Sequence, residues 1–433
     1  MKALTLSLAI LLAGCQVDDD GDGWSVERGD CDDTDPERHP EADEVCNRID
    51  DDCDGTTDEN EEVEPLAPGV HGLDEAHAVI VGEGTQVFGS RLYSAGDLTG
   101  DRVDDLVAVC RTPVDGIPAV CSYPMTFCAG RYFSTEAGAF ILNPNGADNV
   151  TLGDVDNDTL TDLHVGGSIY FSPLAGIASE PSLLVPGGVN AMVAADLDAN
   201  GTVDLVVGDT SSASVRFHRG PFFDGDPGPA VSIRRPGFGH GLAVLRDTDP
   251  PLTFVGAGTS VSVIEGLPTE DSETVERRLD LEPLFPDDAI FIGKGLVSDG
   301  HRRVCIGTDQ YSPVRVVCGT LEELDQGNPS LVIEPRAGTT DEQLGPRLSM
   351  TQDLVAAGHP WAPTPALSQG GLVYVRGEVG WWDFEGSESN SFGTAVALLR
   401  DPILGVTWLA VAAVSEEPGG AIYLFALDAL PTM

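Results

Sequence analysis

The sequence predicts an all-β protein, a seven-bladed β-propeller preceded by a small module held by disulfides and metal. Short apolar runs separated by Gly, Pro, Asp and Asn fill the chain from residue 65 onward, with little helical periodicity. Asp-rich turns with one spacing recur in both regions, and a Phe-Gly pair recurs at long, similar intervals. Many short strands indicate a sandwich, a barrel or a propeller, and a repeat of blade length favours the propeller.

The first fourteen residues have the pattern of an export signal. Lys2 precedes an apolar run, residues 4–12, that is too short to span a bilayer as a mature helix. Leu12-Ala13-Gly14-Cys15 resembles the lipobox of bacterial lipoproteins, which implies cleavage before Cys15 and acylation of its thiol. Gln16 follows the cysteine, and by that resemblance the outer membrane or cell surface is favoured. An ordinary secretory peptide is the alternative.

The charge of the chain excludes several classes of partner. Acidic residues outnumber basic ones by 71 to 23 in 433 residues, which gives a net charge of −48. Nucleic acid and anionic membrane surfaces would repel this chain. We therefore expect no nucleic-acid partner, and membrane contact through the lipid anchor only.

Eight cysteines remain besides Cys15, and an even number in an exported protein indicates disulfides. Cys305 and Cys318 flank an expected hairpin and are a natural pair. The other six form two groups of three, so at least one residue in each group lacks a partner within it. We hypothesise one bridge between the groups, which are Cys31, Cys46 and Cys53, and Cys110, Cys121 and Cys128.

Residues 15–64 are expected to form a separate Asp/Cys-rich module, with residues 65–433 as the propeller. From residue 16 to residue 64 the chain has 22 acidic and three basic residues and little apolar material for a core. Such a segment is either a solvated tether or is held by metal and disulfides.

Two stretches of the module have the spacing of calcium loops. Alternate carboxylates at positions 1, 3 and 5, with Gly at position 6, can converge on one ion. The candidate ligands are Asp18, Asp20 and Asp22 in the first loop, and Asp50, Asp52, Asp54 and Glu61 in the second, with Asp58 as the ligand if that loop closes early.

Residues 30–36, 44–47 and 50–55 together resemble a metal-binding module of exported bacterial proteins, some members of which are linked to copper. The visible ligands are hard oxygens, which favours Ca²⁺ as the cofactor. Sequestration of calcium or copper by this module is an alternative function.

The larger region carries the repeat. Phe88-Gly89, Phe238-Gly239 and Phe392-Gly393 recur 150 and 154 residues apart, which fits three blades of about 50 residues in each interval. We expect blades near residues 84, 150 and 190 with a metal loop, and blades near 238, 286, 341 and 388 without one. Residues 76–81 would form the outer strand that closes the last blade and removes a sheet edge. The first blade interval, from Phe88 to about Val150, is longer than the others and is predicted to be an insertion held by a disulfide. Six or eight blades are the alternative counts.

Three Asp-rich turns follow one pattern, with oxygen side chains at positions 1, 3, 5 and 9 and Leu after the last. They are Asp97, Thr99, Asp101 and Asp105; Asp154, Asp156, Asp158 and Asp162; and Asp196, Asp198, Asn200 and Asp204. The order Phe-Gly, Asp-rich loop, Asp-Leu, apolar strand resembles the FG-GAP repeat of integrin-α-like propellers. This resemblance implies seven blades with calcium in the loops, where we expect a structural clamp rather than an ion that bridges to a partner.

No short catalytic motif is present. The chain has no Gly-x-Ser-x-Gly, no His-Glu-x-x-His and no phosphate-binding Gly loop ending in Lys-Ser/Thr. We therefore predict a non-enzymatic binding or adhesion protein at the cell surface, with an unidentified protein or glycan ligand on the loops of one propeller face. A propeller hydrolase or lyase acting on polysaccharide is the alternative.

Overall fold

The computed structural model describes most of the chain between residues 18 and 428, and its described residues form two compact units, within 1–62 and within 63–433. The described ranges are 18–42, 49–55, 63–83, 88–100, 102–111, 118–125, 130–142, 150–174, 176–178, 180–222, 227–269, 276–285, 292–308, 315–336, 348–365, 367, 370–377, 380–387, 391–416 and 419–428.

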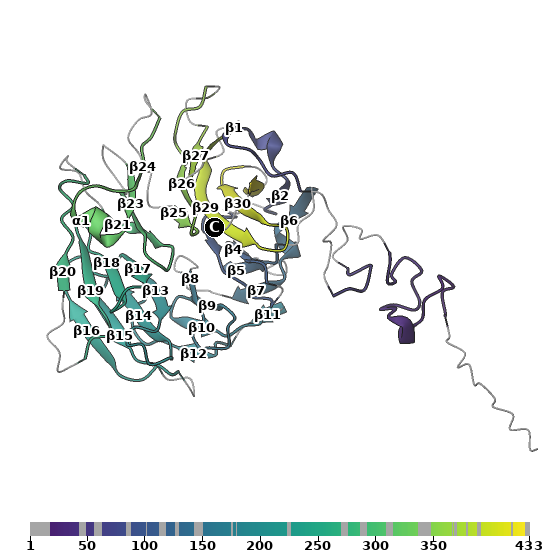
Figure 1. Ribbon diagram of the computed structural model, residues 1–433, viewed down its shortest axis with the longest axis horizontal. Helices are drawn as coiled ribbons and strands as arrows, with labels where there is room; N and C mark the ends of the chain where they lie inside the picture. The colour runs from purple at the N-terminus through teal and green to yellow at the C-terminus, as the bar shows by residue number, and fades with distance from the viewer. Residues whose placement is uncertain are drawn as a thin grey trace, which may run out of the picture. The chain divides into compact units, whose positions relative to one another are not determined.

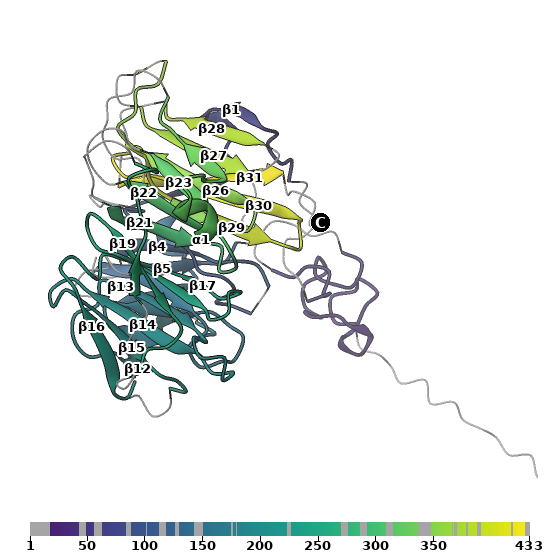
Figure 2. The ribbon, with the colours of Figure 1, turned by 60° about the vertical axis from the view of Figure 1, so that its left-hand side comes forward.

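The larger unit contains seven sheets, each built on four antiparallel strands, which we number blades 1 to 7 in chain order (Figure 1). Blade 1 has β3 (Leu92–Ser94), β4 (Leu106–Arg111), β5 (Pro118–Tyr123) and β7 (Ala139–Leu142). Blade 2 has β8 (Val150–Gly153), β9 (Asp162–Val165), β10 (Ser168–Tyr170) and β12 (Leu183–Leu184). Blade 3 has β13 (Ala191–Ala195), β14 (Asp204–Asp209), β15 (Ser214–His218) and β16 (Ala230–Arg234), which lie side by side in Figure 2.

The other four blades follow the same plan. Blade 4 has β17 (Gly241–Leu245), β18 (Leu252–Gly256), β19 (Val261–Glu265) and β20 (Glu276–Arg278). Blade 5 has β21 (Ile292–Ser298), β22 (Val304–Thr308), β23 (Val316–Gly319) and β24 (Leu331–Ile333). Blade 6 has β25 (Leu348–Met350), β26 (Leu354–His359), β27 (Leu372–Gly377) and β28 (Trp381–Glu385). Blade 7 has β29 (Phe392–Asp401), β30 (Val406–Ala413), β31 (Ala421–Asp428) and β2 (Ala78–Val81).

Helical segments are short. The described residues contain the α-helix α1 (Leu321–Asp325) and three 3₁₀ turns, η1 (Val26–Arg28), η2 (Leu73–Glu75) and η3 (Ser134–Glu136). No helix in these ranges is both long and apolar enough to cross a bilayer. The architecture is thus all-β, as predicted.

The two ends of the propeller meet in blade 7. Strand β2 pairs antiparallel with β31, with Ala78 opposite Leu424 and Val81 opposite Ala421. The first apolar run of the propeller therefore supplies the outer strand of the last blade, which confirms the predicted closure (Figure 1). Pairing one end of the chain with the other removes a sheet edge that would otherwise be exposed.

Three blades carry a fifth, outer strand that runs parallel to its neighbour. Strand β1 (Gly69–His71) pairs with β28, β6 (Gly130–Phe133) pairs with β2, and β11 (Gly176–Ala178) pairs with β7. The long first interval thus sends β6 across to blade 7 before returning as β7 of blade 1. Each fifth strand covers the outer edge of its blade.

Apolar packing closes the ring. The buried apolar side chains of the described residues form seven clusters, each shared by two neighbouring blades, and the cluster around Ile80, Leu106 and Trp408 joins blade 7 to blade 1. Strands that are apolar on both faces, such as β14 and β22, fit between two such clusters. Seven blades with seven interfaces leave no gap in the ring, so the seven-bladed count is correct.

The recurring Phe-Gly pair has a packing role. Phe88, Phe238 and Phe392 are at most 2% exposed. The glycine that follows each of them has a positive φ, for example +95° at Gly239. A Cβ at Gly239 would lie 2.6 Å from the backbone nitrogen of Asp209, so only glycine permits this approach between blades 3 and 4.

Disulfides join adjacent strands of two blades. Cys305 and Cys318 link β22 to β23 in blade 5, and Cys110 and Cys121 link β4 to β5 in blade 1. The second bridge lies within the long first interval, where a disulfide was predicted, and joins two strands of blade 1. The predicted link between the two cysteine groups falls on Cys46 and Cys128, which lie outside the described residues, as does Cys15.

Candidate metal centres

The three Asp-rich loops of the propeller connect the first and second strands of blades 1, 2 and 3, and the loops of blades 1 and 2 touch. The Thr161 N–H of blade 2 donates to the Asp97 carbonyl of blade 1 at 3.2 Å. The Arg246 guanidinium of blade 4 donates to the Ala194 carbonyl, just before the loop of blade 3, at 3.0 Å. The loops therefore lie side by side at one end of their blades.

The Asp at loop position 1 holds its own loop in a tight turn. Both oxygens of Asp154 accept backbone N–H groups, from Asp158 at 3.1 Å and Thr159 at 3.0 Å. Asp196 does the same with Asn200 at 3.1 Å and Gly201 at 2.9 Å. These bonds wind the backbone around the first carboxylate and bring positions 3 and 5 back towards it.

The Asp at position 9 is buried and ties the loop to the rest of its blade. Asp162 is 1% exposed, and its Oδ2 accepts the Val155 N–H at 2.7 Å while its Oδ1 accepts the Ser172 N–H at 3.0 Å. In blade 3, Asp204 accepts the N–H groups of Leu197 and Gly220, each at 3.0 Å. Backbone N–H donors stabilise a buried carboxylate, yet they supply only part of a positive charge.

Three carboxylates converge in each of two propeller loops. One oxygen each from Asp154, Asp156 and Asp162 lies within 4.8 Å of the others, and the same holds for Asp196, Asp198 and Asp204. Burial, together with the nearby charge of Asp156, raises the pKa of Asp162 to about 6. Burial likewise raises the pKa of Asp204 and of Asp156, and the charge of Asp158 adds to the rise at Asp156. The converging carboxylates repel one another when they are ionised, and a divalent cation bound between them would replace this repulsion with attraction.

Other predicted ligands of these loops make different contacts. Asp158 Oδ1 accepts the Leu160 N–H at 2.8 Å, and Asn200 Oδ1 accepts both the N–H and the hydroxyl of Thr202. Arg219 was not predicted from the sequence; its guanidinium lies 2.5 Å from Asp198 Oδ2 and neutralises part of the charge of the blade 3 cluster.

The loop of blade 1 has fewer carboxylates. Asp97 accepts N–H groups from Gly100 and Arg102 at 2.5 and 2.9 Å, and Asp105 accepts the Leu98 N–H at 2.6 Å. Thr99 holds position 3, and Asp101 lies outside the described residues. The backbone of the loop matches those of blades 2 and 3, whereas no group of three carboxylates forms among its described residues.

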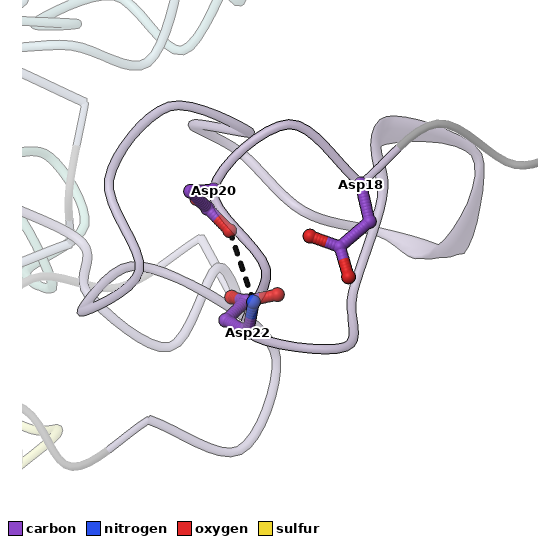
Figure 3. A group of neighbouring side chains, drawn as sticks. All are labelled: Asp18, Asp20 and Asp22. Carbon is purple, nitrogen blue, oxygen red and sulfur yellow. Dashed lines mark hydrogen bonds between the residues drawn. The ribbon is translucent and has the colours of Figure 1, made fainter.

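The small unit holds two further groups of three, Asp18, Asp20 and Asp22, and Asp50, Asp52 and Asp54. Asp50 accepts the Asp54 and Gly55 N–H groups at 3.2 and 3.0 Å, the same winding as in the propeller loops. Figure 3 shows the first group on one turn, with Asp20 bonded to the backbone nitrogen of Asp22. Asp58 and Glu61, predicted for the second loop, lie outside the described residues.

The donors available in the small unit are oxygens. Cys31 and Cys53 form a disulfide, so these two sulfurs are not thiolate ligands. His39 stacks on Trp24, with ring centroids 6.3 Å apart, and its Nδ1 lies 3.1 Å from the Pro40 carbonyl oxygen. Clusters of carboxylate oxygens suit hard cations such as Ca²⁺ better than copper.

Comparison with known proteins covers the two regions unequally. The model of the family described as "Putative metal-binding motif" (Cu-binding_MopE) matches residues 30–59, which include the Cys31–Cys53 disulfide and the second group of carboxylates. No curated protein matches the chain.

Solved structures resemble the larger unit only distantly. The structure titled BBS1N in complex with ARL6DN, soaked with lead, has 15% identity and a TM-score of 0.46, covering 81% of this chain and 95% of that one. The AfRom2 CNH domain has 10% identity and a TM-score of 0.41, covering 78% and 94%. The Dos1 propeller has 12% identity and a TM-score of 0.39, covering 75% and 74%. The fold assignment therefore depends on the strand pairing.

Proposed function

We propose that this chain is an exported surface lipoprotein whose propeller, of the FG-GAP type, is clamped by calcium and binds a protein or glycan ligand without catalysis. The observation that carries the calcium clamp is the convergence of Asp154, Asp156 and Asp162 in blade 2, repeated by Asp196, Asp198 and Asp204 in blade 3. Two neighbouring blades use the same positions of the same loop, which chance acidic turns would not do.

Calcium is favoured by the chemistry of the donors. Carboxylate and carbonyl oxygens at loop positions match the oxygen cages that Ca²⁺ prefers, and the position 9 carboxylate is already held in place by backbone N–H groups. At an ion concentration of 100 times the dissociation constant, each site would contribute about 2.7 kcal/mol to stability. The clamp would fix the loops of blades 2 and 3.

Export and anchoring are supported by the lipobox-like sequence that ends at Cys15 and by the disulfides of the chain. Disulfides persist in exported proteins and are rare in the cytosol. Mass spectrometry of the N-terminal peptide tests this directly. We expect an acylated Cys15 and its loss in C15S; an unmodified mature N-terminus at another residue would refute the anchor.

A ligand-binding role is supported by the absence of a short catalytic motif and by the burial of His164, a residue type that often acts as a catalytic base. His164 is 1% exposed, and its Nε2 accepts the Gly167 N–H at 2.9 Å, so it is a core residue. A screen of glycans and surface proteins, with and without calcium, tests binding. Turnover of a polysaccharide by the purified protein would overturn the non-catalytic proposal in favour of the hydrolase or lyase.

A second candidate function, metal sequestration by the small unit, is favoured by the family match to residues 30–59 and by the carboxylate groups around it. Elemental analysis of the mature protein, after dialysis against calcium and copper together, separates the two metals. We expect calcium in excess, since the sulfurs of Cys31 and Cys53 are oxidised.

A further inference from the structure

Asp30 is a buried carboxylate whose role the loop pattern does not explain. It is 5% exposed, and it stands one residue beyond the twelve-residue loop that begins at Asp18. Its Oδ1 accepts the Asp32 N–H at 2.8 Å. Its Oδ2 is buried and has no hydrogen-bond partner among the described residues.

Two carboxylates of the neighbouring loop repeat this arrangement. Asp20 Oδ1 accepts the Asp22 N–H at 3.2 Å, and Asp22 Oδ1 accepts the Trp24 N–H at 2.6 Å. In both residues the other oxygen, Oδ2, is buried and likewise has no hydrogen-bond partner in the described part of the chain. Three carboxylates therefore each turn one oxygen towards the backbone two residues on and withdraw the other from water.

Asp30 lies near the loop that carries Asp20, outside the group of three carboxylate oxygens that converge within 4.8 Å. The pKa of Asp20 is raised by desolvation and by the charges of Asp22, Asp30 and Asp18. The backbone fixes this approach, because the Asp30 N–H donates to the Ser25 carbonyl at 3.2 Å, which folds the chain back after η1. Figure 3 shows Asp18, Asp20 and Asp22 together on their own loop.

Buried anionic oxygens without donors are costly unless a cation is present. No Arg or Lys forms an ion pair with Asp20, Asp22 or Asp30 among the described residues, and Arg28 instead donates to the Gly23 carbonyl at 2.7 Å. Four carboxylates with no protein cation among them require a counter-ion from solution, and their all-oxygen chemistry selects a hard divalent or trivalent ion.

We propose that Asp30 is a fourth carboxylate ligand of a calcium site formed with Asp18, Asp20 and Asp22. The site extends beyond the family match, which begins at Asp30, and beyond the twelve-residue calcium pattern, which ends at Gly29. Because Asp30 precedes Cys31 of the Cys31–Cys53 disulfide, the ion fastens the segment around Asp18 to the disulfide-bonded part of the small unit. This inference deepens the proposed role of calcium but concerns the small unit alone, so its failure would leave the propeller sites standing.

Terbium luminescence on the full mature protein tests this site. Tb³⁺ replaces Ca²⁺ in oxygen cages, and Trp24 adjoins the loop but also stacks on His39, which is bonded to the second loop. In a D50N/D52N background, which removes the second group of carboxylates, the emission that the W24F variant loses therefore reports this site. D30N is expected to weaken Tb³⁺ binding in that signal at least about tenfold. The matched control is D19N, which removes the same charge from an exposed residue of the same loop and should change the affinity less than about threefold.

A second measurement separates coordination from folding. The decay of the emission in H₂O and in D₂O counts the water molecules on the ion, and D30A should add about one. Mass mapping of the Cys31–Cys53 bridge shows that a variant has folded. Equal affinities of D30N and D19N, or an unchanged water count in a D30A protein that keeps the bridge, would overturn the proposal.

Discussion

Asp162 accepts the backbone N–H of Val155 across the Asp-rich loop of blade 2, at a distance of 2.7 Å. The same bond joins Asp204 to Leu197 in blade 3 and Asp105 to Leu98 in blade 1. Each of these aspartates lies at or just before the start of the second strand of its blade, so one buried carboxylate connects loop closure to strand pairing. Binding of an ion in the loop would therefore stabilise the strand pairing of the blade as well as the loop.

Substitution of Asp162 should lower the free energy of unfolding much more in the presence of calcium than in its absence. D162N removes one anionic ligand and one of two acceptors, so in calcium we expect the free energy of unfolding to fall by about 3 kcal/mol. In EGTA the loss should shrink, because relief of repulsion with Asp156 offsets the missing acceptor. Urea unfolding in both buffers checks this. D353N, which changes an exposed aspartate of blade 6 outside the Asp-rich loops, is the control and should change stability by less than about 1 kcal/mol in either buffer. Equal losses for the two variants would contradict the assigned role.

Calcium binding in blade 2 should weaken as the pH falls below about 6. The folded, metal-free protein holds a proton on Asp162 up to a pKa of about 6, whereas the unfolded chain releases it near 3.8. For this group, stability of the metal-free protein is present at low pH and is lost as the pH rises through 6. Calcium must displace that proton. Isothermal titration at pH 5 and pH 7.5 should show weaker binding at pH 5, and the D162N variant should lose this part of the pH dependence. Equal affinities for calcium at pH 5 and at pH 7.5 would refute this prediction.

His164, two residues further along β9, should change the stability with pH in the direction opposite to Asp162. Burial lowers its pKa from 6.5 to about 4, so the folded protein keeps it neutral while the unfolded chain takes up a proton. Its contribution to stability is present above pH 6.5 and is lost as the pH falls towards 4. Thermal melts of wild type and H164Q in EGTA across this range should differ in slope, with the variant less sensitive to acid. Parallel curves would show that the histidine is accessible to protons in the folded state.

Closure of the ring through β2 should dominate the stability of the propeller. Ile80 is fully buried between blades 7 and 1, so I80A should lower the free energy of unfolding by about 2–5 kcal/mol. Val70, on the fifth strand β1, is 53% exposed, and V70A should change it by less than about 0.5 kcal/mol. Chemical denaturation of both variants is the measurement. A small effect of I80A would indicate that blade 7 is stable without its outer strand.

Much of the fold could be predicted because its signals are local. Apolar runs predicted the strands, and the apolar run at residues 76–81 was correctly predicted to close the last blade. The Phe-Gly pairs predicted the repeat of the blades. The fifth strands β1, β6 and β11 could not be predicted, since each has three or four residues and pairs with a strand distant in sequence. The pairing of β6 with blade 7 depends on tertiary structure, and no local sequence pattern in the insertion predicts it.

The candidate sites divide in the same way. Spacing of two residues identifies Asp154 and Asp156, because it determines the turn that brings them together. Asp30 could not be predicted from this spacing, because it follows a 3₁₀ turn and comes close to the loop only when the chain folds back. Arg219 could not be predicted beside Asp198 either, because it follows β15 and comes close to the loop only through the pairing of β15 with β14 in blade 3.

The measurement that tests the calcium clamp most directly is a melting scan of the mature protein in calcium and in EGTA, with a D154N/D196N variant alongside. If calcium occupies the loops of blades 2 and 3, EGTA should lower the wild-type melting temperature by at least about 5 °C, and the variant should show little change between the buffers. The same wild-type melting temperature in calcium and in EGTA would contradict the account.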